Sequence, residues 1–262
     1  MHPILFQAGA FRLYSYSACA ELGALVAFAL LYARRGRIGL RGPDDYWLLL
    51  DALLLGGFLG GRVGYLATGG LVLPFHWREA VFPLTNGFSV FGVAAGMALG
   101  VWAFCRLRRH RFLGILDPVC AVLPFWMAIA RIGCFLTGCC LGRSAGPARP
   151  WTVVFTDPAC AAPRALLGVP VHPAQLYEAL GDLVLGLVLV RILDLGRRGP
   201  GACAAGFLAG YGALRFLLEF LRGDTVPGLG PLTQGQVLAL GALAMGMVLA
   251  LGCRRPRRRR PA

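Results

Sequence analysis

The chain has 262 residues, of which 57% are hydrophobic, and its mean hydropathy is +0.66. Several windows are long and apolar enough to cross a membrane, so the composition excludes an ordinary soluble domain. The formal net charge is +14, and all 26 basic residues are arginines. Because these arginines form short clusters between apolar segments, they indicate a membrane topology and not a nucleic-acid partner.

Seven membrane-spanning helices are predicted, which makes the fold class an all-α, polytopic integral membrane protein. They cover residues of about 13–33, 46–68, 88–107, 113–131, 174–193, 202–221 and 233–253. No linker or soluble domain interrupts them, so residues 1–262 are expected to form a single membrane domain. Residues 1–10 lack the basic and apolar regions of a removable signal peptide, and none is expected.

The charge distribution sets the expected orientation of these helices. Arginine clusters follow the first, third, fifth and seventh predicted helices and hold 17 of the 26 arginines. With an odd number of helices, all four clusters fall on one side of the membrane, and the positive-inside rule makes that side cytoplasmic. The N-terminus is therefore expected outside the cell and the C-terminus in the cytoplasm.

Two connections on the outer side are longer than simple turns. Residues 69–87 contain His76 and Trp77, which suit a loop at the membrane interface. Residues 138–172 are rich in glycine and proline, and they predict a functional loop or a small outer cap.

The most informative motif is the run ARIGCFLTGCCLGR at residues 130–143. Arg131 ends a long apolar stretch, and an arginine at mid-membrane depth costs roughly 2.5–3.5 kcal/mol. A phosphate is the natural partner of such a guanidinium group, and the neighbouring glycines would let a ligand approach the backbone. The alternative is that Arg131 reaches the interface and the glycines only pack helices.

Further arginines lie within the predicted helices. Arg215, Glu219 and Arg222 are spaced i, i+4, i+7, which would place them on one face of the sixth predicted helix. Glu219 can neutralise one arginine and leave the other for an anion, or the three can form a charge ladder that only fixes helix packing. Arg62 lies near the outer end of the second predicted helix, in the run GGRVGY at residues 60–65.

Polar residues mark the starts of two other predicted helices. His172 precedes the fifth, and it could be a general base, a phosphate ligand or merely a helix cap. Gln175 and Glu178 are i, i+3 neighbours that could organise a polar site or cap the helix. Ser89 is expected to cap the third helix and to offer its hydroxyl to a lipid headgroup.

Nine cysteines are spread along the chain without metal-finger spacing, so no metal site and no cofactor is predicted. The adjacent pair Cys139 and Cys140 would form a strained disulfide and lacks the CxxC spacing of redox motifs. These cysteines are expected to be packing residues or free thiols.

Together these segments resemble the prolipoprotein diacylglyceryl transferases of bacterial inner membranes. The matching stretches, in family order, are Tyr16 and residues 60–65, 86–92, 117–118, 130–143, 172–178, 210–222 and 233–236. The resemblance implies a multi-pass protein of the bacterial cytoplasmic membrane, with its active site towards the outer side. It also implies transfer of the diacylglyceryl group of phosphatidylglycerol to the lipobox cysteine thiol of prolipoproteins, with release of glycerol 1-phosphate.

The resemblance gives roles to particular residues. Arg131 and Arg215 are expected to be catalytic, because arginines in a water-poor cavity stabilise the charge that grows on the leaving phosphate. Residues expected to bind substrate are Tyr16, Arg62, Tyr65, Ser89, Gly142, Arg143, His172, Gln175, Tyr177, Glu219 and Arg222. The prolipoprotein supplies the nucleophile, so no cysteine of this chain needs to be catalytic.

The chain departs from the family pattern at two places. Phe91 stands where many members have a histidine that is a candidate base, and it cannot transfer a proton. Cys134, Thr137 and Cys139 stand where members often have asparagines and a glutamate. The base is left open among His172, a tyrosine, and direct proton loss to water from a thiol whose pKa the arginines lower.

Three other functions are distinguishable from the transferase. A silent relative would bind phospholipid or prolipoprotein without transfer, and Phe91 keeps this reading open. An organic-anion transporter would show inverted repeats, and none is evident in the sequence. A thiol oxidoreductase would need a CxxC. The transferase reading predicts that activity requires Arg131 and Arg215 and survives loss of Cys139 and Cys140.

Overall fold

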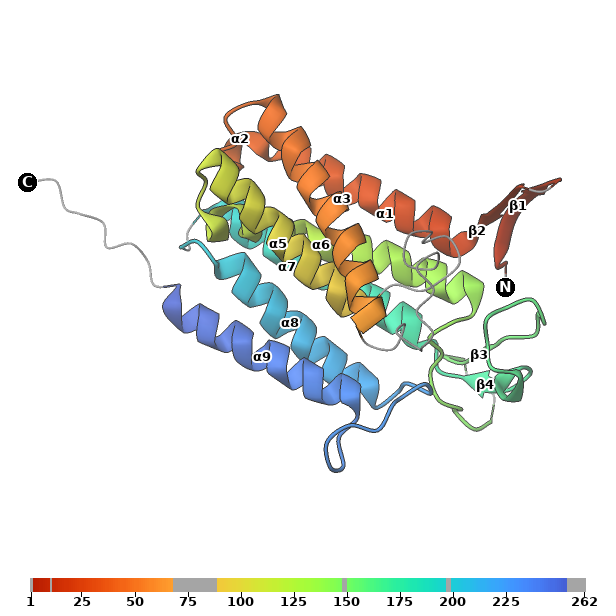
Figure 1. Ribbon diagram of the computed structural model, residues 1–262. Coiled ribbons are helices and arrows are strands. Elements are labelled where there is room, and N and C mark those ends of the chain that lie inside the picture. The colour runs from red at the N-terminus through yellow and green to blue at the C-terminus, as the bar shows by residue number, and fades with distance from the viewer. Residues whose placement is uncertain (1, 10, 68–88, 148–149, 197–198, 254–262) are drawn as a thin grey trace, which may run out of the picture. The chain divides into compact units, whose positions relative to one another are not determined.

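Long helices dominate the computed structural model, which describes residues 2–9, 11–67, 89–147, 150–196 and 199–253 (Figure 1). The long helices within these residues are α1 (Ser15–Ala33), α3 (Pro43–Tyr65), α5 (Val90–Arg108), α6 (Phe112–Thr137), α7 (Ala174–Leu195), α8 (Ala202–Glu219) and α9 (Gln234–Gly252). The shorter elements are β1 (Ile4–Ala8), β2 (Phe11–Tyr14), α2 (Arg35–Ile38), β3 (Val153–Val154), η2 (Arg164–Leu166) and β4 (Pro170–Val171). β1 pairs antiparallel with β2, and β3 pairs antiparallel with β4.

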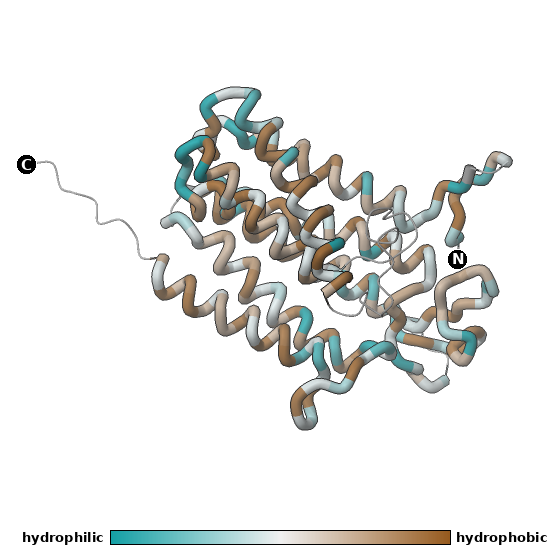
Figure 2. Tube along the Cα trace, in the orientation of Figure 1, coloured by the Kyte–Doolittle hydropathy of each residue, from teal (hydrophilic) through white to brown (hydrophobic). Residues whose placement is uncertain are grey.

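Six of these long helices are apolar enough to cross a membrane, and Figure 2 shows apolar residues along most of their length. The exception is α7, which carries four ionisable residues, namely Glu178, Asp182, Arg191 and Asp194. The side chains of Glu178 and Asp182 are buried, at 1% and 0% relative exposure. The predicted class of helical, multi-pass membrane protein is therefore confirmed, with spanning character found for six of the helices.

Some predictions fall outside the described residues. These are the outer loop at residues 69–87, the first residues of the 86–92 motif, and the arginines at positions 197, 198, 254, 255 and 257–260.

The chain divides into two compact units, one formed by Met1–Leu31 with Asp117–Ala262 and the other by Tyr32–Leu116. In the unit formed by Tyr32–Leu116, α3 and α5 pack through small residues. Glycines spaced four residues apart line this seam, namely Gly56, Gly60 and Gly64 on α3 and Gly92, Gly96 and Gly100 on α5. The absence of side chains allows the two helix backbones to touch, as in small-xxx-small packing of membrane helices.

Gly96 lies where the seam is tightest, since a Cβ atom there would overlap the carbonyl oxygen of Gly56. We expect Gly96→Ala to lower the free energy of unfolding by about 1–3 kcal/mol, because the two backbones would have to separate. Thermal unfolding in detergent would measure the change. The matched control is Gly241→Ala within α9, where a Cβ meets no atom within 4 Å. Equal stability of the two variants would contradict the packing account.

In the other unit, α8 lies beside α9 and against α7 (Figure 1). Gly212 of α8 approaches the α9 backbone, since a Cβ there would lie 2.7 Å from the carbonyl oxygen of Ala239. Gly210 of α8 leaves room for the side chain of Leu185 on α7, where a Cβ would meet Cδ1 at 2.6 Å. Small residues thus set the spacing of these helices.

The first turn of α8 is capped by a carboxylate from α6. Asp117 accepts hydrogen bonds from the backbone N–H groups of Gly201, at 2.7 Å, and of Ala204, at 2.9 Å. The N-cap residue of α8 is Gly201, which has no side chain for this purpose. The 117–118 motif therefore joins two helices that are distant in sequence.

Asp117→Ala is expected to cost about 1–3 kcal/mol of folding free energy, because it leaves buried backbone donors without an acceptor. The unfolding midpoint in detergent would show the loss. Asp157→Ala serves as control, since the side-chain carboxylate of Asp157 accepts from the N–H of Ala159 in an exposed turn. The capping role would be disproved by an Asp117→Ala variant as stable as this control.

Candidate functional site

Residues 138–172, here named the cap segment, connect α6 to α7 and contain β3, η2 and β4. The segment has a small core, formed by Leu141, Phe155, Cys160, Ala162 and Val171. Figure 1 shows the segment at the end of the unit where α6 and α8 finish and where α7 and α9 begin. The predicted loop or cap therefore has folded structure with a small core of its own.

Three backbone stretches meet within this region. The N–H of Gly142 donates to the carbonyl oxygen of His172 at 3.1 Å, and the N–H of Arg143 donates to that of Leu221 at 2.8 Å. A Cβ at position 142 would overlap the carbonyl group of His172, so only glycine fits there. This pairing brings the ends of three matched motifs side by side. Arg143 takes part through its backbone, and its side chain is exposed.

Glu178 is the centre of a buried charge cluster. Its Oε1 atom lies 2.8 Å from Arg131 and its Oε2 atom lies 3.6 Å from Arg222. The hydroxyl of Tyr211 donates to the same carboxylate at 3.5 Å. Glu178 is only 1% exposed, so its charge requires the two arginines. One carboxylate of α7 thereby positions guanidinium groups from two distant parts of the chain.

A second ion pair joins Arg215 to Glu219 at 2.8 Å, which confirms the i, i+4 contact predicted on α8. The hydroxyl of Thr233 donates to Glu219 at 2.9 Å, and its oxygen accepts from the N–H of Gln236 as the N-cap of α9. A side chain at Gly235 would overlap the Glu219 carboxylate. The 233–236 motif thus holds the Glu219 carboxylate against the first turn of α9.

Arg215 has capacity for a further partner. Its second terminal nitrogen, NH1, is buried and makes no hydrogen bond to the residues that the structure describes. Because an unsatisfied buried donor is costly, this nitrogen is suited to an anionic ligand.

The prediction that Arg222 shares a helical face with Arg215 and Glu219 is wrong. α8 ends at Glu219, and tight turns follow in which the N–H of Arg222 donates to the carbonyl oxygen of Glu219 at 3.3 Å. The Arg222 guanidinium group instead binds both carboxylate oxygens of Asp224, at 2.9 and 2.6 Å. Burial opposes the charge of Arg222, but this hydrogen bonding and the nearby Cys140 and Glu178 raise its pKa.

Asp182 is a site residue that the sequence reasoning missed. It lies one turn after Glu178 on α7 and is fully buried. Neither of its carboxylate oxygens has a hydrogen-bond partner among the described residues. The available signal was its i, i+4 spacing from Glu178, which places two carboxylates on one face of α7.

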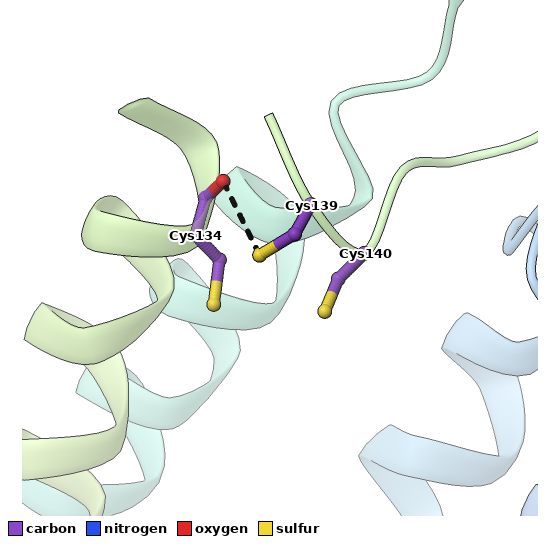
Figure 3. Close-up of side chains that lie close together, drawn as sticks. All are labelled: Cys134, Cys139 and Cys140. Atoms are coloured by element: carbon purple, nitrogen blue, oxygen red, sulfur yellow. Dashed lines mark hydrogen bonds between the residues drawn. The ribbon is translucent and has the colours of Figure 1, made fainter. Parts of the chain in front are cut away.

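Three cysteines gather at the end of α6 (Figure 3), and Arg131 interacts electrostatically with two of them, Cys134 and Cys140. The sulfur atoms of Cys134, Cys139 and Cys140 all lie within 4.8 Å of one another. Hydrogen bonding with the thiols of Cys134 and Cys139 lowers the pKa of the Cys140 thiol, and the positive charges of Arg131 and Arg222 lower it further. The sequence analysis did not predict this grouping, although the run Cys-x4-Cys-Cys was its signal.

Tyr16 and Gln175 adjoin the cysteines. The first turn of α1 crosses α6 at Gly133, where a Cβ would lie 3.0 Å from the Cα of Tyr16. Tyr16 interacts electrostatically with Arg131 and Cys134. Gln175 is buried, and its side-chain amide donates to the carbonyl oxygen of Cys139 at 2.7 Å. Both predicted residues therefore lie at the charge cluster.

His172 and Tyr177 lie at the edge of the cap segment. The ring centroids of the two residues are 6.5 Å apart. The Nδ1 atom of His172 is buried and has no hydrogen-bond partner within the described part of the chain. The hydroxyl of Tyr177 donates to the carbonyl oxygen of Trp151 at 3.3 Å.

The other predicted site residues belong to the Tyr32–Leu116 unit. Arg62 is buried, and its guanidinium carbon lies 5.4 Å from the ring centroid of Tyr65. Ser89 caps α5 as predicted, because its hydroxyl oxygen accepts from the N–H of Gly92 at 3.3 Å. Phe91 is 62% exposed on the same helix.

Comparisons with known proteins give the family to which the chain is similar. Residues 3–251 match the family model described as prolipoprotein diacylglyceryl transferase. The chain is 30% identical over 240 residues to the phosphatidylglycerol–prolipoprotein diacylglyceryl transferase of Clostridium tetani, covering 91% of this chain and 92% of the relative. Identities to proteins of the same name are 33% in Serratia proteamaculans and 34% in Sodalis glossinidius, each covering 90% of this chain and 88% of the relative.

Proposed function

Because the chain belongs to the prolipoprotein diacylglyceryl transferase family, we propose that it transfers the diacylglyceryl group of phosphatidylglycerol to the lipobox cysteine thiol of prolipoproteins. The bond between the glyceryl carbon and the phosphate oxygen breaks, a thioether forms, and glycerol 1-phosphate leaves. The family membership confirms the family predicted from the sequence.

The observation that carries this proposal is that Arg131, Arg215 and Arg222 each pair with a buried glutamate, either Glu178 or Glu219. The leaving group is a phosphate monoester, so negative charge grows on its oxygens as the bond breaks. Guanidinium groups that are already oriented stabilise this charge without reorganisation, and burial strengthens the effect.

The charged residues that form the three ion pairs have distinct roles in this reaction. Arg131 and Arg215 contact the phosphate, and the free nitrogen of Arg215 supplies one donor. Glu178 orients Arg131 and Arg222, and Glu219 orients Arg215. The remaining residues that contact phospholipid or prolipoprotein are Tyr16, Arg62, Tyr65, Ser89, Gly142, Arg143, His172, Gln175 and Tyr177.

We place the protein in the bacterial cytoplasmic membrane, with its N-terminus outside, its C-terminus in the cytoplasm and its active site towards the outer side. α6 begins at Phe112, directly after the arginine cluster of residues 106–111, and ends 26 residues later beside the cap segment. A helix of this length crosses the bilayer, so the arginine cluster and the cap segment lie on opposite sides. The positive-inside rule then puts the cap segment outside.

Cells depleted of their own diacylglyceryl transferase provide the test. Expression of this chain is expected to restore diacylglyceryl modification of a reporter prolipoprotein, measured as the mass increase of its lipobox peptide. A reporter whose lipobox cysteine is replaced by serine is the control and stays unmodified. An unmodified cysteine reporter in cells whose membranes contain the chain would contradict the proposal.

A further inference from the structure

The three cysteines at the end of α6 are held in place by the backbone. Gly138, with φ of 79°, ends the helix in a Schellman turn, in which the N–H of Cys139 donates to the carbonyl oxygen of Cys134 at 3.1 Å. This turn folds Cys139 back over Cys134, and the Cys139 thiol also donates to the Cys134 carbonyl oxygen at 3.8 Å (Figure 3). Cys140 follows with φ of 58°, a strained value for a residue with a side chain.

The neighbouring chain supports the same arrangement. Gln175 of α7 fixes the carbonyl group of Cys139 through its 2.7 Å hydrogen bond, and Gln175 is itself 1% exposed. The three sulfur atoms are therefore brought within 4.8 Å by hydrogen bonds on both sides of the turn.

The spacing of the sulfur atoms suits a soft, tetrahedral metal ion. Zinc binds thiolates at about 2.3 Å, which puts the sulfur atoms of a tetrahedral site about 3.8 Å apart. The three sulfur atoms lie within 4.8 Å of one another, so movements of about 1 Å or less would bring them to this spacing. Sulfur ligands select zinc and other soft ions over magnesium or calcium.

The charges near the cysteines fit this ligand set. Three thiolates outweigh the charge of one zinc ion, so the complex is anionic. The guanidinium groups of Arg131 and Arg222 interact electrostatically with Cys140, so positive charge lies next to the position of this anionic complex. Three protein ligands also leave the fourth tetrahedral position open, as in catalytic zinc sites.

We propose that Cys134, Cys139 and Cys140 bind one zinc ion, whose open fourth position takes the lipobox cysteine thiol of the prolipoprotein. The role of the acceptor thiol as the fourth ligand rests on the proposed function, whereas zinc binding by the three cysteines does not. Arg131 lies one turn before Cys134 on α6, so the acceptor thiol would lie beside the phosphate-binding arginines.

The chemistry balances without a base from this chain. On binding zinc the acceptor thiol loses its proton to water, since a coordinated thiol is deprotonated. A lone pair of its sulfur attacks the glyceryl carbon, the carbon–sulfur bond forms, and the carbon–oxygen bond breaks. The bonding electron pair stays on the phosphate oxygen of glycerol 1-phosphate. The oxidation state of zinc does not change, and the thioether, a weaker ligand than the thiolate, can leave.

This zinc site would explain how transfer can proceed although Phe91 stands where many family members have a histidine. A phenylalanine cannot accept the thiol proton, and zinc coordination removes the need for a protein group that does. It also reverses one expectation from the sequence, because transfer should now decline when Cys139 or Cys140 is lost.

Metal binding by the full-length protein in detergent tests the site independently of catalysis. The reduced protein is stripped with a chelator, supplied with zinc or cobalt, and desalted. We expect one retained zinc ion per chain, and for cobalt a thiolate-to-metal charge-transfer band in the near ultraviolet. Cys139→Ser is expected to lose affinity by at least about 100-fold. Cys253→Ser, which removes a partly exposed thiol at the end of α9, should bind normally.

The open position is tested by adding a lipobox peptide to the cobalt-loaded protein. The cysteine peptide should shift the charge-transfer band, and a serine peptide should not. The site would be disproved if the reduced wild-type protein retained no metal, or if Cys139→Ser bound as tightly as Cys253→Ser. An unshifted band, or unchanged transfer by metal-free protein, would overturn the substrate-ligand role. Absent transfer by zinc-loaded protein would instead count against the proposed function.

Discussion

Replacement of Arg131 by alanine is expected to lower the rate of diacylglyceryl transfer by about 10²–10³-fold, the usual effect of removing one oriented stabiliser of transition-state charge. Arg131 is 2.8 Å from Glu178 and half-buried, so its guanidinium group is already oriented before the phosphate leaves. Water that enters the space left by alanine would reorganise during the reaction and stabilise the leaving oxygens less well.

Initial rates with labelled phosphatidylglycerol and a lipobox peptide measure this effect. Arg131→Lys should fall between the wild type and alanine, because lysine keeps the charge but loses the planar fork that binds a phosphate through two nitrogens. Arg164→Ala, which removes an exposed arginine of η2 in the cap segment, is the matched control and should react at the wild-type rate. If Arg131→Ala reacted as fast as Arg164→Ala, the phosphate role of Arg131 would be refuted.

Glu178→Ala is expected to lower the free energy of unfolding by about 3–5 kcal/mol, because it leaves buried cations without their counter-charge. Glu178 contacts both Arg131 and Arg222 and is 1% exposed. The same change would release both arginines from their positions, so transfer should fall with stability.

Unfolding in detergent, followed by circular dichroism, measures the loss. The control is Asp224→Ala, which removes another partner of Arg222 whose side chain is 46% exposed. The Asp224 carboxylate is open to solvent and Arg222 keeps Glu178 as a partner, so the loss should be about 0–1 kcal/mol and this variant should remain close to the wild type. A Glu178→Ala protein as stable as Asp224→Ala would show that Glu178 does not compensate the buried charges.

Hydropathy was sufficient to predict the long helices, but their ends depend on local hydrogen bonds. α6 continues to Thr137, six residues beyond its predicted end at 131, because the Schellman turn at Gly138 is what stops it. α8 stops at Glu219, two residues before its predicted end, where tight turns lead into the pairing of Arg222 with Gly142. The β1–β2 hairpin was not predicted, since its strands are too short to show a clear alternation.

Local contacts of the site were predictable and distant ones were not. The Arg215–Glu219 pair and the Ser89 cap follow from spacing along a helix. The ion pair of Arg131 with Glu178 joins residues 47 positions apart, and no periodic pattern in the sequence indicates such a distant contact. The same holds for Gln175 and Cys139, whose hydrogen bond helps to gather the cysteines.

The most direct test of the central claim uses the purified chain, phosphatidylglycerol with a labelled diacylglyceryl group, and a lipobox peptide. We expect label on the peptide cysteine and glycerol 1-phosphate in equal amount, and both products should form about 10²–10³-fold more slowly with Arg131→Ala or Arg215→Ala. Folded wild-type protein that binds phosphatidylglycerol but yields neither product would contradict the claim that these arginines stabilise a leaving phosphate.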